Sequence, residues 1–551
     1  MTVNGSLPRV DAATTVGRTL AALGVQDAFG VLGSGNFVAT QALHAAGAAF
    51  HHARHEGGAI SMADGYARVS GRVGVCSVHQ GPGFTNMLTG LTEAAKSRTP
   101  LLVLAGEAPR AAIRSNFRID QPAIAATLGA VPERIHSGAT AAADTARALR
   151  RARVERRPVV LNLPLDVQGE ESPGGAAPGR LREPERPAPA PEAVAEVAEL
   201  IQAAARPVIV AGRGAVLADA REPLERLGAA IGAVLATSAM GHGLFEGSPW
   251  AVGISGGFAS PIAARLMAEA DLVLAFGAGL TRWTTRDGAL IARGAKVVQI
   301  DLDEESLGAH RPVHAAVVGD AAATAEALLA SGVAGRGFRD TPGLEQEIAA
   351  GSWRDAPFED AGDATHLDPR ALSIALDEIL PAERTLAVDS GHFMGFPPMY
   401  LKVPDAQGFV FTQAFQSIGL GLASGMGAAI ARPDRLTVAC LGDGGALMSL
   451  PELETLARLR LPMLVVIYND AAYGAEVHHF GPHGHPVELV QFPDTDFAAL
   501  AQAAGAQGLT VRTEDDLAAV EPWLARRDGP LVVDAKITPD FCAEWLEEAF
   551  R

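Results

Sequence analysis

The segment that decides the fold is Leu436-Thr437-Val438-Ala439-Cys440-Leu441-Gly442-Asp443-Gly444-Gly445. An apolar run of this length is typical of a buried strand in a parallel sheet, and the glycines indicate a tight loop at its carboxyl end. A second apolar run, from Met463 to Tyr468, leads to Asn469-Asp470. Because parallel strands end at the same edge of a sheet, we expect Asp443 and Asp470 to lie close together.

This pair of carboxylates predicts a divalent metal site. Mg²⁺ and Ca²⁺ prefer oxygen ligands, and Mg²⁺ shares its remaining positions with phosphate and water. The absence of side chains at Gly442, Gly444 and Gly445 lets backbone N–H groups approach a diphosphate. The alternative is a tight turn that binds nothing. The second acidic pair, at this spacing, favours the metal site.

The composition is that of an α/β protein with several domains. The chain has 551 residues, which is too long for one core, and it is 48% hydrophobic but only 5% aromatic, with 60 glycines. Its net charge of −18 argues against nucleic acid or an anionic membrane as a partner.

Cysteine usage and hydropathy suggest a cytoplasmic protein. Cys76, Cys440 and Cys542 are scattered and form no C-x-x-C pair, so a disulfide scaffold is not expected. No apolar run has the length of a membrane span, and Met1 to Pro8 lacks the apolar region of a signal peptide.

Two stretches of the chain repeat the same pattern of strand, glycine loop, helix, proline and strand. The offset is 435 − 72 = 363 at the first strand and 462 − 100 = 362 at the proline. Chance similarity between alanine-rich helices is the alternative, but matching order and spacing favour duplication. We therefore predict an α/β fold of three doubly wound parallel-sheet domains, with the first and third related. The predicted bounds are 1–170, 193–330 and 366–551.

A third motif extends the pattern to the first domain. His55-Glu56-Gly57-Gly58-Ala59, followed by Ala63-Asp64-Gly65-Tyr66-Ala67-Arg68, resembles the HE-x-x-A-x-x-x-A-x-G-Y-A-R segment of thiamin-diphosphate enzymes. Together with the two acidic motifs, the chain resembles the acetolactate synthase, pyruvate oxidase and benzaldehyde lyase group over nearly its whole length. The resemblance implies a pyrimidine-binding domain, a middle domain and a diphosphate-binding domain, in that order.

The resemblance also implies roles for individual residues. Glu56 is the glutamate that activates the cofactor's pyrimidine ring; a helix-dipole role is the alternative. Ile418 is the bulky residue under the cofactor, unless it is simple core packing, and the Gln416 carbonyl accepts from the amino group. The metal ligands implied are Asp443, Asp470, where the family usually has Asn, and the carbonyl of Ala472. The other cofactor contacts implied are Ser390, Gly391, His392, Gly442, Gly444, Gly445, Ala446, Tyr473 and Gly474.

The resemblance also implies substrate contacts in two loops of the first domain, one with Ser34 and one with His79 and Gln80. Ser34 could bind a substrate carboxylate, and His79 and Gln80 could take part in catalysis, with His79 as a proton relay near neutral pH. The alternative for His79 is a structural histidine in a surface loop. A histidine cluster at 478, 479, 483 and 485 favours an active-site lid or a solvated loop over a zinc site, because no acidic or Cys partner has ligand spacing.

The leading functional hypothesis is an acetolactate-synthase-like reaction, in which a 2-oxoacid is decarboxylated and the resulting enamine is ligated to a second carbonyl. Non-ligating decarboxylation, acyloin cleavage of the benzaldehyde lyase kind and a non-catalytic regulatory role are the alternatives. His79-Gln80 replaces the Thr-Ser of acetolactate synthases, the segment from Asn116 to Gln121 departs from their Phe-Gln-Glu motif, and Arg282 could substitute for the missing acceptor-binding arginines. The acceptor pocket is therefore expected to differ.

Two further expectations come from the same resemblance. FAD in the middle domain is undecided, because Gly212-Arg213-Gly214 is too common a pattern to indicate it. A homodimer or homotetramer is expected, with Glu56 and Asp443 meeting across a dimer interface.

Overall fold

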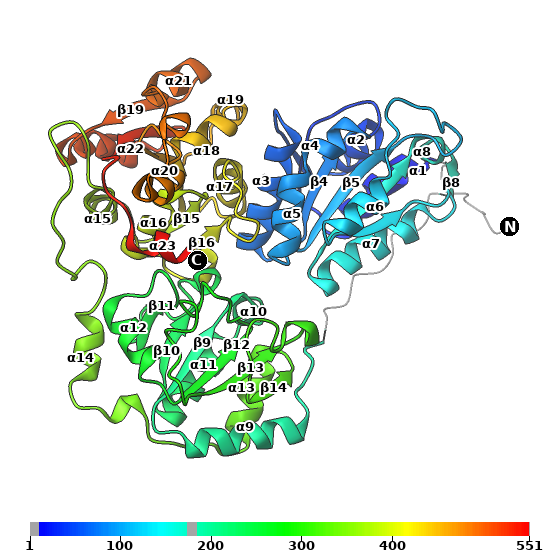
Figure 1. Cartoon of the computed structure of the whole chain (residues 1–551). Coiled ribbons are helices and arrows are strands. Elements are labelled where there is room, and N and C mark those ends of the chain that lie inside the picture. Colours follow the sequence, from blue (N-terminus) through cyan, green and yellow to red (C-terminus); the bar gives the residue numbers. More distant parts are fainter. Residues whose placement is uncertain (1–9, 174–184, 550–551) are drawn as a thin grey trace.

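The computed structural model describes residues 10–173 and 185–549, and these form three α/β domains (Figure 1). Each domain contains a six-stranded parallel sheet flanked by helices, so the predicted fold class is confirmed. Residues 1–9, and part of the linker predicted over 169–192, lie outside the described residues. Within those described ranges, no helix combines the length and apolar character needed to cross a bilayer.

The N-terminal domain has the sheet order β3-β2-β4-β5-β7-β6. Its strands are β2 (Asp27–Gly30), β3 (Ala49–His52), β4 (Gly74–Val78), β5 (Leu101–Glu107), β6 (Val131–Arg134) and β7 (Pro158–Pro164). Its helices are α1 (Ala12–Ala22), α2 (Phe37–Ala45), α3 (Glu56–Ser70), α4 (Pro82–Asn86), α5 (Leu88–Lys96), α6 (Gln121–Thr127), α7 (Ala141–Glu155) and α8 (Leu165–Gln168). An antiparallel pair, β1 (Val10–Asp11) and β8 (Glu171–Ser172), closes the domain.

The middle domain has the order β11-β10-β9-β12-β13-β14, which is the 3-2-1-4-5-6 order of dinucleotide-binding folds. Its strands are β9 (Pro207–Ala211), β10 (Val234–Thr237), β11 (Ala251–Ile254), β12 (Leu272–Phe276), β13 (Lys296–Asp301) and β14 (Ala315–Val318). Its helices are α9 (Pro191–Ala203), α10 (Arg213–Leu217), α11 (Arg221–Ile231), α12 (Pro261–Ala268) and α13 (Ala321–Ala330); α14 (Leu344–Ala349) follows in the connection.

The C-terminal domain has the order β16-β15-β17-β18-β20-β19. Its strands are β15 (Arg384–Val388), β16 (Phe409–Phe411), β17 (Leu436–Gly442), β18 (Leu464–Asn469), β19 (Gln507–Val511) and β20 (Leu531–Lys536). Its helices are α15 (Pro369–Ile379), α16 (Phe396–Tyr400), α17 (Gly421–Ala431), α18 (Asp443–Met448), α19 (Pro451–Leu459), α20 (Gly474–Phe480), α21 (Phe497–Ala504), α22 (Glu521–Arg526) and α23 (Glu544–Ala549).

The first and third sheets have the same topology. Strand for strand in chain order, both follow 2-1-3-4-6-5. The repeated sequence segments fall on β4 and β5 in one domain and on β17 and β18 in the other. Ligands of such sheets bind outside the carboxyl ends of the strands, where the strand order reverses. In the C-terminal domain this point lies between β15 and β17, next to Asp443.

Helices α3 and α17 join these two domains and lie side by side (Figure 1). The contact is close enough to require glycine. A Cβ on Gly65 would lie 2.0 Å from the Ser424 carbonyl oxygen, and one on Gly427 would lie 1.9 Å from the Met62 carbonyl oxygen. The absent side chains therefore let the two backbones approach each other.

Candidate active site

Asp443 and Asp470 lie together at the carboxyl edge of the third sheet. Asp443 begins α18 directly after β17, Asp470 follows β18, and these two strands pair in parallel. Asp443 is only 6% exposed. Burial raises the pKa of Asp443, and burial together with the nearby Asp443 charge raises the pKa of Asp470. Two desolvated carboxylates in mutual contact form a donor set that suits a hard divalent cation.

The pair should make metal uptake depend on pH. Protons compete with the metal, so Mg²⁺ binding is expected to strengthen from pH 6 to pH 8, the range of the raised pKa values. Without metal, the pH dependence has the opposite direction, because the stability of the fold decreases as the pH rises. These groups have an ordinary pKa of 3.8, so their contribution to stability is full below that pH and is lost as the pH rises through the folded values.

Melting curves at pH 6 and pH 8 test this prediction, measured in EDTA and in Mg²⁺ with thiamin diphosphate. We expect the rise in Tm caused by the ligands to be larger at pH 8. An equal rise at both pH values would contradict it.

The glycines around this pair are in contact with other side chains of the site. A Cβ on Gly444 would lie 2.5 Å from the ring of Tyr473, and one on Gly474 would meet the Asp470 carboxylate. Only glycine therefore permits this packing. Ala446 is buried one turn into α18.

Ser390, Gly391 and His392 follow β15, the strand that lies next to β17 at the point where the strand order reverses. Gly391 has a positive φ of 132°. Burial, followed by the nearby His478, lowers the pKa of His392 to about 3, so this imidazole is neutral. Its Nε2 accepts a hydrogen bond from the Ala543 backbone N–H at 3.1 Å. The loop is therefore held by the C-terminal segment of the chain.

The N-terminal domain gathers a second group of predicted residues. Glu56 begins α3 and is 9% exposed, and its Oε2 accepts a hydrogen bond from Asn86 Nδ2 at 2.9 Å. A Cβ on Gly83 would lie 3.1 Å from Glu56 Oε1 and 3.0 Å from the Cβ of His79. His79 in turn contacts Ser34, with 3.3 Å between Nε2 and Oγ. The sequence analysis assigned no role to Asn86.

The contacts of His79 define its tautomer. Its Nδ1 lies 2.9 Å from the Gln80 carbonyl oxygen, which can only accept, so Nδ1 carries the proton in the neutral ring. Nε2 is then free to accept from the Ser34 hydroxyl. The ring of Phe117 packs edge-on against His79 at 5.2 Å. The imidazole therefore presents one basic nitrogen beside Ser34, as a proton relay requires.

Two glutamines near this group are buried. Gln80 is 2% exposed and packs against Gly35 and Gly106, and within the described chain its Oε1 has no hydrogen-bond partner. Gln121 bonds the backbone of Gly81 and Gly106 and the side chain of Asn162. Gln121 thus shapes the loop after β4.

Glu56 faces away from the C-terminal domain of its own chain. The face of α3 that meets that domain carries Gly58, Met62 and Gly65, at helical spacing. A Cβ on Gly58 would collide with the Glu452 carboxylate, whereas Glu56 bonds Asn86. At 3.6 residues per turn, positions 56 and 58 point in nearly opposite directions. One chain therefore does not direct Glu56 toward Asp443.

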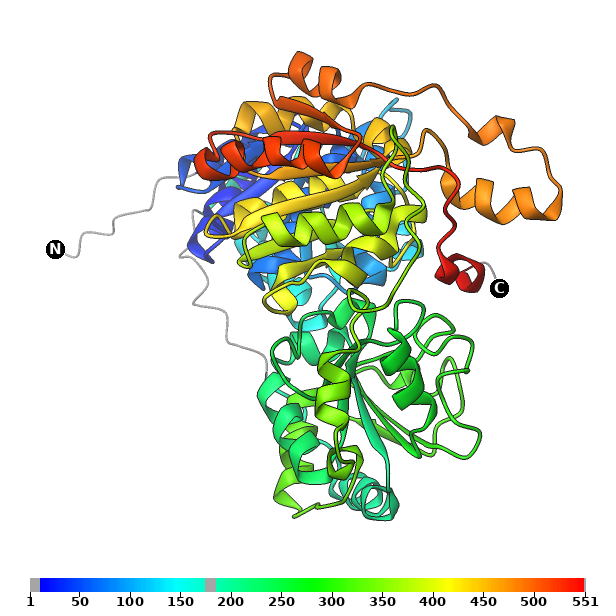
Figure 2. The same ribbon diagram turned by 90° about the vertical axis from the view of Figure 1, so that its left-hand side faces the viewer.

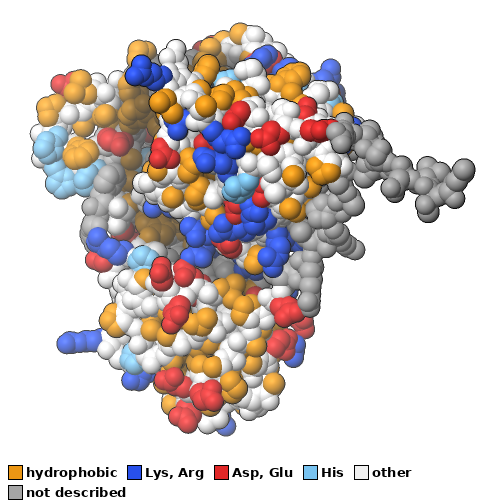
Figure 3. Space-filling model, turned by 90° about the vertical axis from the view of Figure 1, so that its right-hand side faces the viewer, with side chains coloured by type: hydrophobic (Ala, Val, Ile, Leu, Met, Phe, Trp, Pro, Cys, Tyr) orange, Lys and Arg blue, Asp and Glu red, His pale blue; other side chains and the backbone are white. Residues whose placement is uncertain are grey.

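The four histidines at 478, 479, 483 and 485 lie on α20 and the segment directly after it, here called the arm, which projects from the body and is coloured orange in Figure 2. Figure 3 shows histidine side chains gathered on this lobe and a hollow beside it. The rings of His392 and His478 lie 4.4 Å apart, so the arm contacts the loop of Ser390 to His392. Over the described ranges, no group of three or more His, Cys, Asp or Glu side chains is arranged to hold a metal ion.

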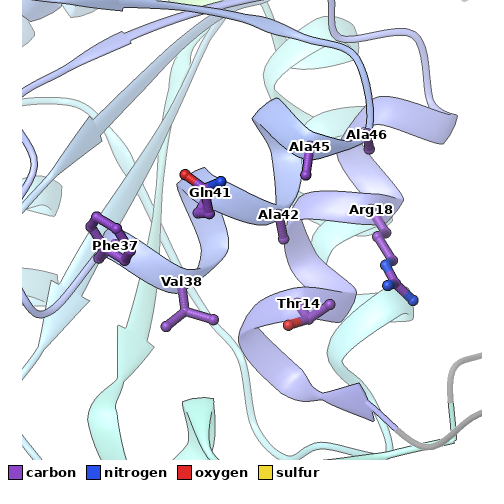
Figure 4. Close-up of a pocket in the computed structure, with 8 residues that line it drawn as sticks. All are labelled: Thr14, Arg18, Phe37, Val38, Gln41, Ala42, Ala45 and Ala46. Atoms are coloured by element: carbon purple, nitrogen blue, oxygen red, sulfur yellow. The ribbon is translucent and has the colours of Figure 1, made fainter.

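Two other features lie away from these groups. A cavity of about 340 Å³ between α1 and α2 is lined by Thr14, Arg18, Phe37, Val38, Gln41, Ala42, Ala45 and Ala46 (Figure 4), none of them a predicted site residue. In the middle domain, a Cβ on Gly212 would lie 2.2 Å from the Gly277 carbonyl oxygen. Close packing accounts for this glycine, so it gives no support for FAD.

Comparison with known proteins gives the same three-part division. Residues 10–126, 194–328 and 389–535 match the N-terminal, central and C-terminal domains of thiamine pyrophosphate enzymes. The chain is 30% identical to sulfoacetaldehyde acetyltransferase of Rhodobacter capsulatus (90% of this chain, 88% of the relative) and 30% identical to the acetolactate synthase large subunit of Parasynechococcus marenigrum (85% and 78%). It is 32% identical to a probable 2-ketoarginine decarboxylase of Pseudomonas aeruginosa (92% and 89%).

Proposed function

This chain belongs to the thiamine pyrophosphate enzymes, and we propose that it decarboxylates a 2-oxoacid and joins the remaining acyl unit to a second carbonyl compound. The observation that carries the catalytic role is the pairing of Glu56 with Asn86 beside the Ser34–His79 contact. The ligation step is supported by relatives whose names describe an acetyltransferase and an acetolactate synthase.

The residues of the third sheet would hold the cofactor. Asp443, Asp470 and the Ala472 carbonyl would hold Mg²⁺, which would help to hold the diphosphate. When bound, thiamin diphosphate supplies a nucleophilic carbon and an electron sink for a carbonyl substrate. The neutral His392 would lie beside the bound cofactor without adding charge. The arm, formed by α20 and the segment after it, would close over the cofactor.

The N-terminal group would act on the cofactor ring and the substrate. Glu56, oriented by Asn86, would hold or release a proton at the pyrimidine ring. Ser34 would orient the substrate, and His79 would take or return a proton at Nε2. Phe117, whose ring packs edge-on against His79, would restrict the position of the imidazole.

The active unit would be a homodimer or a dimer of dimers. Glu56 points away from the carboxylates of its own chain, so a second copy must bring its Glu56 to Asp443. Helix α18 and the loops beside it expose apolar side chains that such a copy could cover, namely those of Phe415, Leu447, Met448 and Tyr473. Each dimer would contain two such shared sites.

Mixing two inactive variants tests the shared site. Glu56→Gln and Asp443→Ala should each be inactive alone. After joint unfolding and refolding in equal amounts, about half of the dimers are mixed, and each has one intact site, so about a quarter of wild-type activity should return. No recovery, with mixed dimers demonstrated by differential tagging, would place both residues in one chain.

Decarboxylation without ligation is the second candidate, because the Ser34–His79 pair can deliver a proton and one relative is named as a decarboxylase. Product analysis with pyruvate alone, and then with pyruvate and an aldehyde, separates the two. An acyloin or acetolactate product with release of CO₂ supports ligation. Aldehyde as the only product in both assays would reject it.

A further inference from the structure

The loop at residues 412–420, here called the wedge loop, connects β16 to α17 and carries Gln416 and Ile418. It forms no helix or strand, Phe415 is 44% exposed, and Gln416 has a positive φ of 60°. A non-glycine residue in this region is strained and persists only where surrounding contacts impose it. Ile418 is only partly buried, so simple core packing does not account for it. The shape of the loop must therefore be imposed from outside.

One end of the wedge loop is held by Asp389, the last residue before the Ser390 loop. Asp389 is fully buried, and its Oδ2 accepts from the Gly419 backbone N–H at 2.8 Å while Oδ1 accepts from Leu420 at 3.2 Å. A Cβ on Gly445 would lie 2.4 Å from the same Oδ2. One carboxylate thus touches the wedge loop and the helix that begins with Asp443.

The other end is held by a different domain. Glu93, on α5 of the N-terminal domain, is 1% exposed and accepts from the Phe415 backbone N–H at 2.7 Å. Its Oε1 accepts from Arg68 Nη2 at 2.8 Å, and Nη1 of the same guanidinium donates to the Phe411 carbonyl oxygen at 2.8 Å. The buried Arg68–Glu93 pair therefore holds the chain at Phe411, where β16 ends, and at Phe415, immediately before Gln416.

A buried ion pair is weak evidence of stabilisation, because desolvation opposes the charge attraction, but it can impose one arrangement on its surroundings. Here Glu93 bonds the backbone of the wedge loop itself, at Phe415, and Arg68, which also contacts Asp64 and Ser97, bonds the backbone of Phe411 directly before the loop. Asp389 does the same from the opposite end. The three residues between these anchors are Gln416, Ser417 and Ile418.

We propose that Asp389 and Glu93 are positioning residues that lock the wedge loop, so that Gln416 and Ile418 hold the aminopyrimidine in its reactive orientation. Glu93 acts across domains, and Asp389 also ties the loop to α18. The inference rests on the proposed function, because it requires that thiamin diphosphate binds here and contacts Gln416 and Ile418.

Glu93→Asp is the discriminating variant. It keeps the charge opposite Arg68 but is one methylene shorter, so it cannot hold both Arg68 and the Phe415 N–H. Asp389→Asn tests the other anchor. Asp320→Asn is the matched control, because Asp320 is an equally buried carboxylate that accepts from two backbone N–H groups in the middle domain, far from the wedge loop.

Three measurements are made on each variant: calorimetric affinity for thiamin diphosphate with Mg²⁺, near-ultraviolet circular dichroism of the bound cofactor, and deuterium exchange of the thiazolium C2 proton. For Glu93→Asp we expect exchange to fall by about 10²-fold, as misplacement near 1 Å can cause, with affinity changed less than about tenfold. Asp389→Asn should lose both exchange and dichroism. The control should match wild type in all three.

Wild-type exchange and dichroism in both Glu93→Asp and Asp389→Asn would overturn the inference. So would an equal loss in Asp320→Asn, because that would indicate general destabilisation. If the wild-type protein takes up no cofactor, the proposed function itself fails, and this inference fails with it. The wild-type calorimetry therefore separates the two cases.

Discussion

Replacing Glu56 with glutamine is expected to reduce turnover by about 10²–10⁴-fold, the range typical of a lost general acid or base. Glutamine has the same shape but cannot exchange a proton with the pyrimidine ring. Asn86 can still donate to the amide oxygen, so the side chain keeps its place. Affinity for thiamin diphosphate with Mg²⁺ should change little, because the diphosphate anchor lies on another domain. Steady-state kinetics and calorimetry measure the two effects separately.

Asn86→Ala provides the comparison for this variant. It leaves the carboxylate in place but removes the hydrogen bond that orients it, so turnover should fall less than in Glu56→Gln. Wild-type turnover in Glu56→Gln would reject the role of this glutamate. A parallel loss of cofactor affinity would instead indicate that the substitution disturbs the fold.

Much of this architecture is predictable from local sequence. The apolar runs before Gly442 and Asn469 become the neighbouring strands β17 and β18 because both are buried on two faces. The nearly constant offset between the repeated segments corresponds to two sheets with identical topology. These features depend on short-range patterns, and such patterns are visible along a single chain.

Contacts between distant segments are not predictable in this way. The Glu93 bond to Phe415 joins residues 322 positions apart, and Glu452 bonds the backbone of His55 across 397 positions. Glu93 lies within an ordinary amphipathic helix, and nothing in its neighbourhood reveals a partner. The structural role of Gln121 could not be predicted for the same reason, because its three hydrogen bonds depend on how the loop after β4 folds back.

The orientation of side chains is the second limit. The motif at His55-Glu56 places a glutamate at a helix start, but only the packed α3 shows that the side with Gly58, and not the side with Glu56, meets the C-terminal domain. That direction is what separates a site within one chain from a site between two chains. It follows from which face of α3 is apolar and small, and that depends on α17.

Asp443→Ala is expected to weaken the Mg²⁺-dependent binding of thiamin diphosphate by at least about 10²-fold, more than the loss of an outer contact to a metal site. The substitution removes one carboxylate from the pair and leaves Asp470 without its neighbour. Asp470→Ala should have a similar effect. Asp470→Asn should retain affinity within about tenfold, because the amide keeps an oxygen ligand and the like charges no longer repel.

Calorimetric titration with the cofactor, in Mg²⁺ and in EDTA, distinguishes these variants. Asp470→Asn should also weaken the pH dependence expected of the pair, because only the Asp443 carboxyl group then titrates. Loss of binding in Asp470→Asn as severe as in Asp470→Ala would mean that the second charge, and not only the oxygen, is needed to hold the cation. Unchanged binding in Asp443→Ala would mean that the metal site lies elsewhere. The two aspartates must act together, because each alone is a single ligand at the end of a strand.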